Sequence, residues 1–342
     1  MSEAVTKEAI TEALSTVMEP ELHEDLISLN FIRDLDVKGR DVAFTIMLTT
    51  PACPLKHVLQ EDSERAIRNR VPEVDTISIN FDSEVRSDNR IQDKLKLPIK
   101  NILAVSSGKG GVGKSTISVN LAVSLAQAGA KTGLLDADIY GPNIPLMMGV
   151  EQLPPAVDNK LIPAVAYDVE LMSMGFLIPQ AEALVWRGPM LHSAIQQLFT
   201  EVTWSNLDYL VVDLPPGTGD AQLSLAQLVP LTGGVIVTGP QKVAVSDARR
   251  GVSAFKRLEV PILGVIENMS GDLFGAGGGE KVAQELGVDF IGSIGLHREI
   301  PQSSDGGVPF VVNHTDEPVS EEFQRIARVL AGKISIIDAK AS

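Results

Sequence analysis

The residues with the most specific chemistry lie in the segment GKGGVGKST at 108–116. It follows an apolar run at 102–105, precedes a helical pattern, and satisfies the phosphate-loop motif G-x-x-x-x-G-K-[ST]. In such a loop glycines let successive backbone N–H groups face a phosphate, and the helix that begins there adds the positive end of its dipole. We therefore expect Lys114 to bridge the β- and γ-phosphates of a nucleotide and the Ser115 hydroxyl to bind Mg²⁺. The predicted nucleotide-binding residues in this loop are Gly108, Lys109, Gly110, Gly111, Val112, Gly113, Lys114, Ser115 and Thr116.

Carboxylates follow two further apolar runs. Asp136 and Asp138 come after the run at 132–135, and Asp213 follows the run at 209–212. An apolar strand that ends in aspartate is the Walker B arrangement, in which the carboxylate holds magnesium through its water shell. Short acidic side chains beside a triphosphate suit both the binding of Mg²⁺ and the orientation of water. The alternatives are a helix cap at Asp136, a surface Asp138 and an ordinary strand-terminal Asp213.

Two further groups complete the predicted site. Gly217, in the segment LPPGTGD, is expected to place its backbone N–H near the γ-phosphate, which would make 214–220 a switch segment. Asn268 follows the apolar run at 262–266, and its amide offers the donor and the acceptor that adenine needs. The competing interpretation of Asn268 is a simple turn residue.

The elements that must hold these residues alternate between strand and helix. Helical stretches separate short apolar runs at 102–105, 132–135, 209–212, 235–237 and 262–266. Strands that repeatedly precede helices form a doubly wound, mainly parallel α/β sheet, with ligands at the carboxyl ends of the strands. We predict this domain over 99–335, followed by a tail at 336–342.

Residues 1–84 have a different pattern. Apolar residues at helical spacing in 6–18 and 55–71, and alternation in 41–48 and 76–81, predict a small α+β domain. The segment 85–98 is charged and nearly free of apolar periodicity, so we expect a linker there.

The composition narrows the class of protein. With 342 residues, 44% of them hydrophobic, and a net charge of −15 at pH 7, the chain is expected to be globular and to avoid nucleic acid and anionic membranes. No apolar run reaches about 18 residues, and the first residues lack the pattern of a secretory signal. The single cysteine, Cys53, excludes an intramolecular disulfide and favours a reducing compartment, so we expect a cytoplasmic location.

With Lys109, the phosphate loop reads KGGVGKST and resembles the deviant Walker A loop of the MinD, ParA and nitrogenase iron-protein class. The resemblance implies that Lys109 reaches across a nucleotide-sandwich homodimer to the phosphates of the other subunit. It also implies that Asp138 positions or activates water and that Asp136 supports the magnesium shell. The implied catalytic residues are Lys109, Lys114 and Asp138, and an exposed loop cation is the alternative for Lys109.

A larger set of segments resembles the Mrp/ApbC family of iron–sulfur cluster carrier ATPases. They are KGGVGKST, DADIYGPNIP, MGF at 174–176, WRGPM at 186–190, DYLVVDLPPGTGD and ENMS, and the likeness extends over 98–330. The first domain, with EPEL, SLNFIRDLDV and LTTPACP, resembles the small PaaD-like domain associated with iron–sulfur protein maturation. The resemblance implies a dimeric switch that binds and hydrolyses ATP with Mg²⁺ and acts in cluster assembly or transfer to apo-proteins. Core packing is the alternative for Trp186 and Arg187.

The chain departs from that family in its cysteines. Members usually carry a C-x-x-C pair after the ENMS segment, whereas this chain continues GDLFGAGGGEK and has no cysteine beyond Cys53. Cys53 precedes a predicted helix whose N-terminus can favour the thiolate, so it is the candidate iron–sulfur ligand, with His57 as its nearest histidine. A buried structural cysteine is the alternative. Two other functions stay open: a metal-free ATPase assembly chaperone, and a ParA- or MinD-like positioning ATPase on DNA or membrane, which the acidic charge disfavours.

Overall fold

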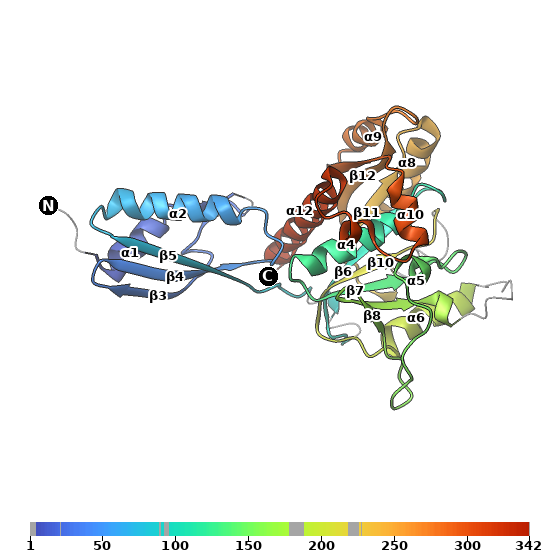
Figure 1. Cartoon of the computed structure of the whole chain (residues 1–342), viewed down its shortest axis with the longest axis horizontal. Coiled ribbons are helices and arrows are strands. Elements are labelled where there is room, and N and C mark those ends of the chain that lie inside the picture. The colour runs from blue at the N-terminus through green and yellow to red at the C-terminus, as the bar shows by residue number, and fades with distance from the viewer. Residues whose placement is uncertain are drawn as a thin grey trace. The chain divides into compact units, whose positions relative to one another are not determined.

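The chain folds into two compact units, and many of their helices and strands are labelled in Figure 1. The computed structural model describes residues 5–20, 22–88, 90–91, 96–177, 188–217, 226 and 228–341. Unit 1 comprises Met1–Arg86 together with Ala331–Ser342, and unit 2 comprises Ser87–Leu330.

Unit 1 is built on a three-stranded sheet in the order β3-β4-β5. β3 (Ile32–Lys38) pairs antiparallel with β4 (Asp41–Leu48), and β4 pairs parallel with β5 (Thr76–Ser83). A two-stranded ribbon of β1 (Met18–Glu19) and β2 (Glu24–Asp25) precedes the sheet. β4 and β5 cover the two stretches, 41–48 and 76–81, in which the sequence showed the alternation of a strand.

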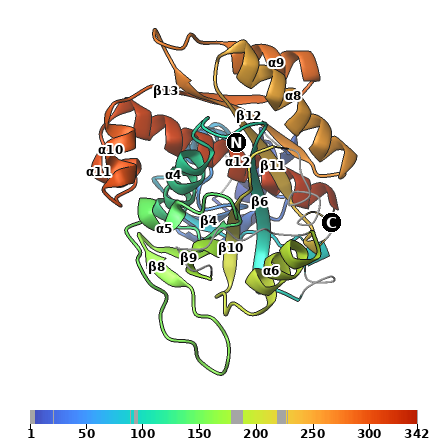
Figure 2. The ribbon, with the colours of Figure 1, turned by 90° about the vertical axis from the view of Figure 1, so that its right-hand side faces the viewer.

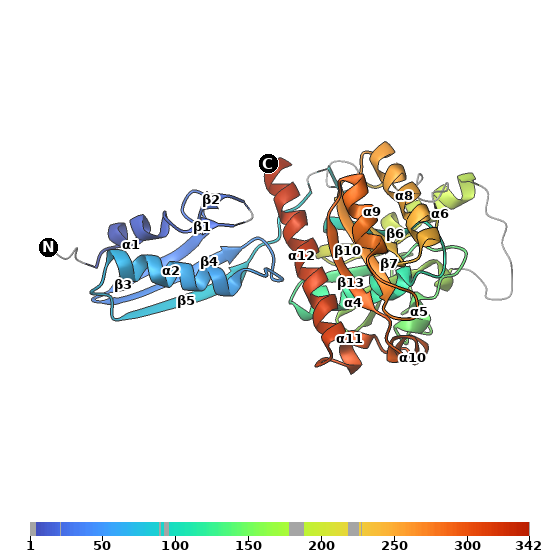
Figure 3. The ribbon, with the colours of Figure 1, turned by 90° about the horizontal axis from the view of Figure 1, so that it is seen from above.

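Two helices cover one face of this sheet, α1 (Lys7–Leu14) and α2 (Lys56–Arg70) (Figure 3). Alternate residues of β4, among them Phe44 and Ile46, are buried in one core with Ile10 of α1 and Leu59 of α2. The predicted α+β domain is therefore confirmed, and its helices lie where the apolar spacing indicated.

Unit 2 is built on an eight-stranded sheet in the order β13-β12-β11-β6-β10-β7-β9-β8. The strands are β6 (Ile99–Ser107), β7 (Thr132–Asp136), β8 (Ala164–Ala166), β9 (Val169–Ser173), β10 (Leu207–Asp213), β11 (Gly233–Thr238), β12 (Ile262–Ser270) and β13 (Phe290–Gly295). All neighbours pair parallel except β8 and β9, which pair antiparallel. The doubly wound, mainly parallel α/β sheet predicted from the sequence is confirmed.

Helices cover both faces of the large sheet, with α4 on one side and α6 and α8 on the other (Figure 2). Among the described residues, the α-helices that begin in unit 2 are α4 (Lys114–Gln127), α5 (Ile144–Met147), α6 (Gly188–Thr200), α8 (Lys242–Arg257), α9 (Gly278–Leu286), α10 (Glu299–Asp305), α11 (Phe310–Asn313) and α12 (Pro318–Ala341). Because both faces are covered, β7 and β11 are buried at every residue and β10 at every residue but one, instead of at alternate residues. β10 lies between β6 and β7, which brings the carboxyl ends of these three strands together.

The segment predicted as a linker, 85–98, differs from expectation. Ile91 and Leu97 are buried in the core of unit 2, and the Asp88 carboxylate is buried against Arg90 and accepts a hydrogen bond from Thr232 Oγ1 at 3.1 Å. Its few apolar residues are widely spaced among charges, so no periodicity marks them as core. Within this segment Val85 and Arg86 belong to unit 1, and the described residues from Ser87 on belong to unit 2 and bury Asp88, Ile91 and Leu97.

The predicted tail, 336–342, also differs, because α12 continues to Ala341. Ile334, Ser335 and Asp338 are buried, and Ser335 Oγ lies 3.4 Å from the carbonyl oxygen of Thr49 within unit 1. The end of the helix thus has a buried face, which the polar and small residues around it concealed in the sequence. Among the residues that the structure describes, no helix combines the length and the apolar character needed to cross a membrane.

Candidate functional site

The phosphate loop joins β6 to α4 and depends on glycine at several positions. Gly111 and Gly113 have φ of 79° and 80°, in the left-handed region that favours glycine. A Cβ at Gly113 would lie 2.1 Å from Asn268 Nδ2, and a Cβ at Gly108 would lie 2.1 Å from the backbone of Asp247 on α8. β12 and α8 therefore pack on the loop from two sides, and the loop is exposed to solvent at Gly110 and Gly111.

A cavity of about 420 Å³ lies in front of this loop. It is lined by Ser107, Gly110, Gly111, Gly113, Lys114, Ser115, Thr116, Asp138, Tyr140, Gly141, Asn143, Met147 and Pro216. The first seven of these belong to β6, the loop and the start of α4, and Asp138 to Met147 belong to the segment after β7. The structure thus brings the predicted phosphate loop and the predicted catalytic carboxylate to one cavity.

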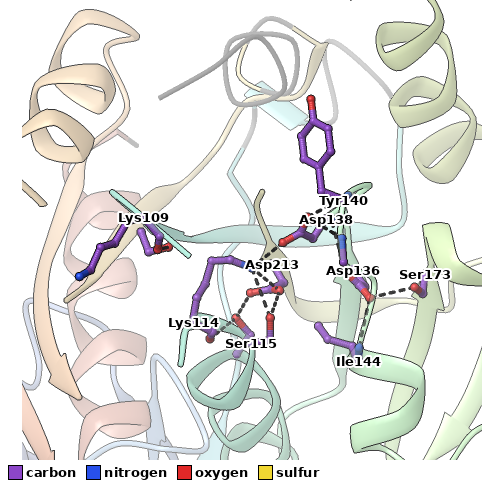
Figure 4. A network of polar contacts seen from close by, with 12 residues as sticks. Lys109, Lys114, Ser115, Asp136, Asp138, Tyr140, Ile144, Ser173 and Asp213 are labelled. Carbon is purple, nitrogen blue, oxygen red and sulfur yellow. Dashed lines mark hydrogen bonds and ion pairs between the residues drawn. The ribbon is translucent and has the colours of Figure 1, made fainter. Parts of the chain in front are cut away.

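Asp213, at the end of β10, organises the base of the site (Figure 4). Its side chain is fully buried, and its Oδ2 atom lies 2.5 Å from Lys114 Nζ and accepts a hydrogen bond from Ser115 Oγ at 2.6 Å. Its Oδ1 atom accepts a hydrogen bond from Ser118 Oγ at 2.6 Å. One carboxylate therefore holds the lysine and the two serine hydroxyls of the first turns of α4.

Asp138 lies beside this cluster and faces the cavity. Its Oδ2 atom is 3.6 Å from Lys114 Nζ, and its Oδ1 atom accepts hydrogen bonds from the backbone N–H groups of Tyr140 and Gly141 at 3.1 and 3.3 Å. Burial raises the pKa of Asp138 above the usual 3.8, while Lys114 acts to lower it. A carboxylate with a raised pKa that opens onto a cavity suits a group that handles water.

Asp136 is fully buried and does not line the cavity. Its Oδ1 atom accepts the N–H of Asp138 at 3.2 Å, and its Oδ2 atom accepts the N–H of Ile144 at 3.2 Å and the hydroxyl of Ser173 at 2.9 Å. Burial, followed by the charge of Asp213, raises the pKa of Asp136 from 3.8 to about 7.

Asn268 lies at the phosphate loop, and its contacts there are to the protein. Its side chain is buried, and Nδ2 donates to the carbonyl oxygen of Val112 at 2.8 Å. It is not among the residues that line the cavity. This contact positions the loop, and the base-reading role stays a prediction.

Gly217 has φ of 97°, and its N–H donates to the carbonyl oxygen of Ser107 at 2.8 Å. The neighbouring Pro216 lines the cavity. The start of the predicted switch segment is thus attached to the end of β6, and residues 218–220 lie outside the described residues, as do Trp186 and Arg187 of the WRGPM motif.

Lys109 points away from the Lys114–Asp213 cluster in Figure 4. Its carbonyl oxygen accepts a hydrogen bond from Ser107 Oγ at 2.9 Å, which ties the loop backbone to β6. The side chain is not among the residues that line the cavity. Within one subunit the geometry therefore leaves Lys109 outside the site, and its role across a dimer stays a prediction.

Cys53 belongs to unit 1, between β4 and α2, where it is partly buried against the core. Its N–H donates to the carbonyl oxygen of Thr50 at 3.2 Å, and His57 is exposed on the first turn of α2. Within the described ranges, no group of three or more His, Cys, Asp or Glu side chains is arranged to hold a metal ion. The role of Cys53 as a cluster ligand stays a prediction.

The segment that stands in place of a C-x-x-C pair forms a tight turn after β12. Gly271 and Gly275 exchange both backbone hydrogen bonds, at 2.9 and 2.7 Å. Leu273 and Phe274 at its tip are exposed.

Two serines of the site were missed by sequence reasoning. Ser118 lies one helical turn after Lys114, so its spacing could have placed it under the loop. Ser173 ends β9, and nothing in the sequence shows that β9 pairs with β7.

The donor set of the site fits a magnesium nucleotide. The Ser115 hydroxyl and the Asp213 carboxylate are hard oxygen donors of the kind that Mg²⁺ prefers. Positive-φ glycines and the N-terminus of α4 offer backbone N–H groups to phosphate, and Lys114 offers a cation.

Fold and site together define a P-loop NTPase, and solved structures agree. The nucleotide-binding protein of Archaeoglobus fulgidus, solved in complex with ADP, is 34% identical with a TM-score of 0.56 over 65% of this chain and 93% of that chain. The cell division ATPase MinD of Pyrococcus furiosus matches with a TM-score of 0.55 at 21% identity, over 67% of this chain and 97% of that chain. At 21% identity, the similarity to MinD shows a shared fold and nothing more.

Family comparisons are more specific. The profile described as NUBPL iron-transfer P-loop NTPase matches residues 98–331, and the profile described as iron-sulfur cluster assembly protein matches residues 7–79. The iron-sulfur cluster carrier protein of Synechocystis is 45% identical over 97% of this chain and 99% of its own length. That of Deinococcus radiodurans is 46% identical over 96% of each chain. The chain belongs to the family of NUBPL-type iron-transfer P-loop NTPases, which confirms the resemblance drawn from its motifs.

Proposed function

We propose that this protein is an ATP-binding and ATP-hydrolysing switch that works as a homodimer in iron–sulfur cluster assembly or in cluster transfer to apo-proteins. The observation that carries the proposal is the buried contact of Lys114 and Ser115 with Asp213, at the base of a cavity that Asp138 also lines. The carrier and transfer proteins among the relatives support the class of cargo.

The proposal assigns the triphosphate to the backbone N–H groups of the loop, with Lys114 as the neutralising cation. In the structure the Lys114 ammonium group is held by Asp213 at 2.5 Å and lies 3.6 Å from Asp138. Phosphate oxygens entering the cavity compete with these carboxylates for the lysine. Lys114 then exchanges a buried protein partner for the nucleotide, and this exchange couples nucleotide binding to the end of β10.

Mg²⁺, when bound, supplies charge neutralisation at the phosphates. Ser115 and Asp213 are the residues that would hold it, because Ser115 lines the cavity and its hydroxyl donates to the Asp213 carboxylate directly behind it. Asp138 orients the attacking water, since its carboxylate faces the cavity and its Oδ1 atom is held by two backbone N–H groups. Positioning of this kind is the main protein contribution to phosphoryl transfer.

Phosphate release measured with Mg²⁺ and either ATP or GTP tests the activity. We expect ATP hydrolysis above the background of the Lys114→Ala variant, and slow turnover without a partner. Equal phosphate release from the wild type and from Lys114→Ala would show that the protein is not a hydrolase at this site.

The number of cysteines constrains how a cluster could be carried, because a four-iron cluster is normally held by four thiolates. Cys53 is the single cysteine of the chain, so a homodimer supplies two. Carriage through Cys53 therefore requires thiols from the apo-protein or from a small molecule. Anaerobic reconstitution followed by iron and sulfide quantitation, on wild type and Cys53→Ala, tests this: iron lost in the variant supports carriage, and equal iron in both contradicts the role of Cys53.

The single cysteine also favours a second candidate function, a metal-free ATPase that acts as an assembly chaperone. This function predicts normal ATP hydrolysis together with no iron under every reconstitution condition. For both functions we propose a cytoplasmic protein, because the single cysteine suits a reducing compartment. We also propose no nucleic-acid or membrane surface, because the net charge is −15.

A further inference from the structure

Three adjacent parallel strands end in polar side chains at the same level of the large sheet. The register pairs Asp213 of β10 with Asp136 of β7, and Asp136 with Ser173 of β9. All three residues are fully buried. The row therefore extends from Asp213, which contacts the cavity-lining Lys114 and Ser115, to β9, which contributes none of the residues that line the cavity.

The Asp136 carboxylate closes the segment that follows it into a loop. Its two oxygen atoms accept the N–H groups of Asp138 and Ile144, each at 3.2 Å. One wall of the cavity is lined by Asp138, Tyr140, Gly141 and Asn143. This wall segment begins at the first of the two anchored residues, Asp138, and ends just before the second, Ile144. The backbone of this wall is therefore held at both ends by one side chain.

Ser173 completes the arrangement from the other side. Its hydroxyl donates to Asp136 Oδ2 at 2.9 Å and accepts the N–H of Gly175 at 2.9 Å, at the start of the short helix η1 (Met174–Phe176). A Cβ at Gly175 would lie 3.2 Å from Pro142 Cβ, so this turn packs directly on the wall segment. One hydroxyl thus connects the MGF turn to the carboxylate that holds the wall.

We propose that Asp136 and Ser173 are positioning residues for Asp138, and that Asp136 acts through the backbone of 138–144 and not as a magnesium ligand. All three hydrogen bonds that Asp136 accepts come from the protein, and its side chain is sealed from the cavity. Asp138 then keeps its place because its own N–H is anchored. This inference rests on the proposed ATP hydrolysis, in which Asp138 orients water.

The test compares Ser173→Ala, Ser173→Thr and Asp136→Asn with the wild type. Ser320→Ala is the matched control, because Ser320 is fully buried in α12 and its hydroxyl has no hydrogen-bond partner among the described residues. Hydrogen exchange of the nucleotide-free protein reports on the amides of Asp138 and Ile144 without any catalysis. We expect faster exchange of these amides in Ser173→Ala and Asp136→Asn, and wild-type exchange in Ser320→Ala.

Steady-state kinetics add a readout that a general loss of structure would not produce. We expect kcat for ATP to fall by about 10- to 100-fold in Ser173→Ala, with KM within about threefold of the wild type, because a small displacement of a water-orienting group costs rate and not binding. Ser173→Thr retains the hydroxyl and should recover most of kcat. The Mg²⁺ concentration for half-maximal rate should stay unchanged in Asp136→Asn.

A raised Mg²⁺ requirement in Asp136→Asn, with kcat restored at saturating Mg²⁺, would instead assign Asp136 to the metal. Wild-type exchange and wild-type kcat in Ser173→Ala would overturn the positioning role. If the wild type hydrolyses no ATP, the proposed function fails, while the exchange measurement still decides whether Asp136 and Ser173 hold the wall.

Discussion

At Asp213 one buried carboxylate meets a lysine and two hydroxyl groups from the first turns of α4. A buried charge is stable only when it is paired and hydrogen-bonded. The same contacts that stabilise the nucleotide-free protein are those that phosphate and Mg²⁺ would replace. Residues of this cluster should therefore affect both stability and binding.

Lys114→Ala leaves Asp213 without its cation in a site where its side chain is fully buried. Removing one partner of a buried ion pair costs about 3–5 kcal/mol, and we expect a loss near the lower end because Ser115 and Ser118 remain. Urea unfolding of the nucleotide-free protein measures this loss, and fluorescence titration with a labelled nucleotide should show that binding disappears.

Lys131→Ala is the control, because Lys131 is exposed beyond the end of α4. It should change the free energy of unfolding by less than about 0.5 kcal/mol. An equal effect of both substitutions would contradict the account of the buried pair.

The raised pKa of Asp136 predicts that the free energy of unfolding depends on pH. Its pKa rises from 3.8 to about 7 on folding, so between these values the folded chain holds a proton that the unfolded chain has released. Unfolding then releases a proton, and the contribution of Asp136 to the free energy of unfolding falls as pH rises through this window. Below 3.8 both states are protonated, and above about 7 both are ionised, so the contribution is constant outside it.

Urea unfolding between pH 4 and 8, without nucleotide or Mg²⁺, measures the effect. Asp136→Asn should lose this part of the pH dependence, whereas Asp272→Asn, at an exposed residue of the turn after β12, should keep it. Parallel pH curves for the wild type and Asp136→Asn would contradict the raised pKa.

At the scale of elements, the phosphate loop is shaped by what packs on it. β12 delivers Asn268 to the loop, where its amide donates to Val112 and leaves no room for a side chain at Gly113. α8 approaches Gly108 with its backbone at Asp247. The glycines thus serve close packing as well as phosphate contact.

Gly113→Ala should combine backbone strain with a steric conflict. Gly113 has φ of 80°, and an added Cβ would lie 2.1 Å from Asn268 Nδ2. We expect a loss of about 2 kcal/mol or more in the free energy of unfolding, with at least about tenfold weaker nucleotide binding, because the loop must shift. Calorimetry and nucleotide titration measure the two effects.

Gly287→Ala at the end of α9 separates the two causes. Gly287 has φ of 63°, but no atom lies within 4 Å of the added Cβ. It should cost only the backbone strain, about 1 kcal/mol, and leave nucleotide binding unchanged. If Gly113→Ala lowered the free energy of unfolding no more than Gly287→Ala, the Asn268 side chain would have moved away from the added Cβ without destabilising the protein.

The strands that hold the site were predictable because burial on both faces makes them continuous apolar runs bounded by glycine and aspartate. The short strands β8 and β9 were not predicted, since so few residues show neither a clear apolar run nor a clear alternation of apolar and polar side chains. The end of α12 and the buried residues of 85–98 were missed for the same reason: isolated apolar residues among polar ones acquire a core face only through tertiary contacts.

At the scale of the whole molecule, Lys109 has no place in the cavity of its own subunit. A loop lysine that points away from the site can still act on a nucleotide held by a second copy. The homodimer is therefore the assembly in which this residue would have a role.

Lys109→Ala should spare nucleotide binding to the monomer but prevent ATP-dependent dimerisation and slow hydrolysis by at least about tenfold, because a cation supplied in trans stabilises the charge that develops on the phosphates. Light scattering with ATP, in an Asp138→Asn background that slows hydrolysis, reports the dimer. Dimers of equal stability with and without Lys109 would remove it from the interface.

By itself, the sequence determined the class of fold, the phosphate loop and the family, because these depend on local glycines, on apolar runs and on motifs of adjacent residues. It also supplied the one-cysteine constraint on cluster chemistry. Only the tertiary structure decided which side chains share a contact. The strand order β6-β10-β7-β9 puts Asp213, Asp136 and Ser173 in one buried row, and Lys114 of α4 contacts the Asp213 end of this row although the two residues are 99 positions apart in the chain. Pairing between strands far apart in the sequence leaves no local pattern. The sequence alone therefore made Asp136 a candidate metal ligand, whereas in the fold its carboxylate accepts the N–H groups of Asp138 and Ile144 at the two ends of the wall segment.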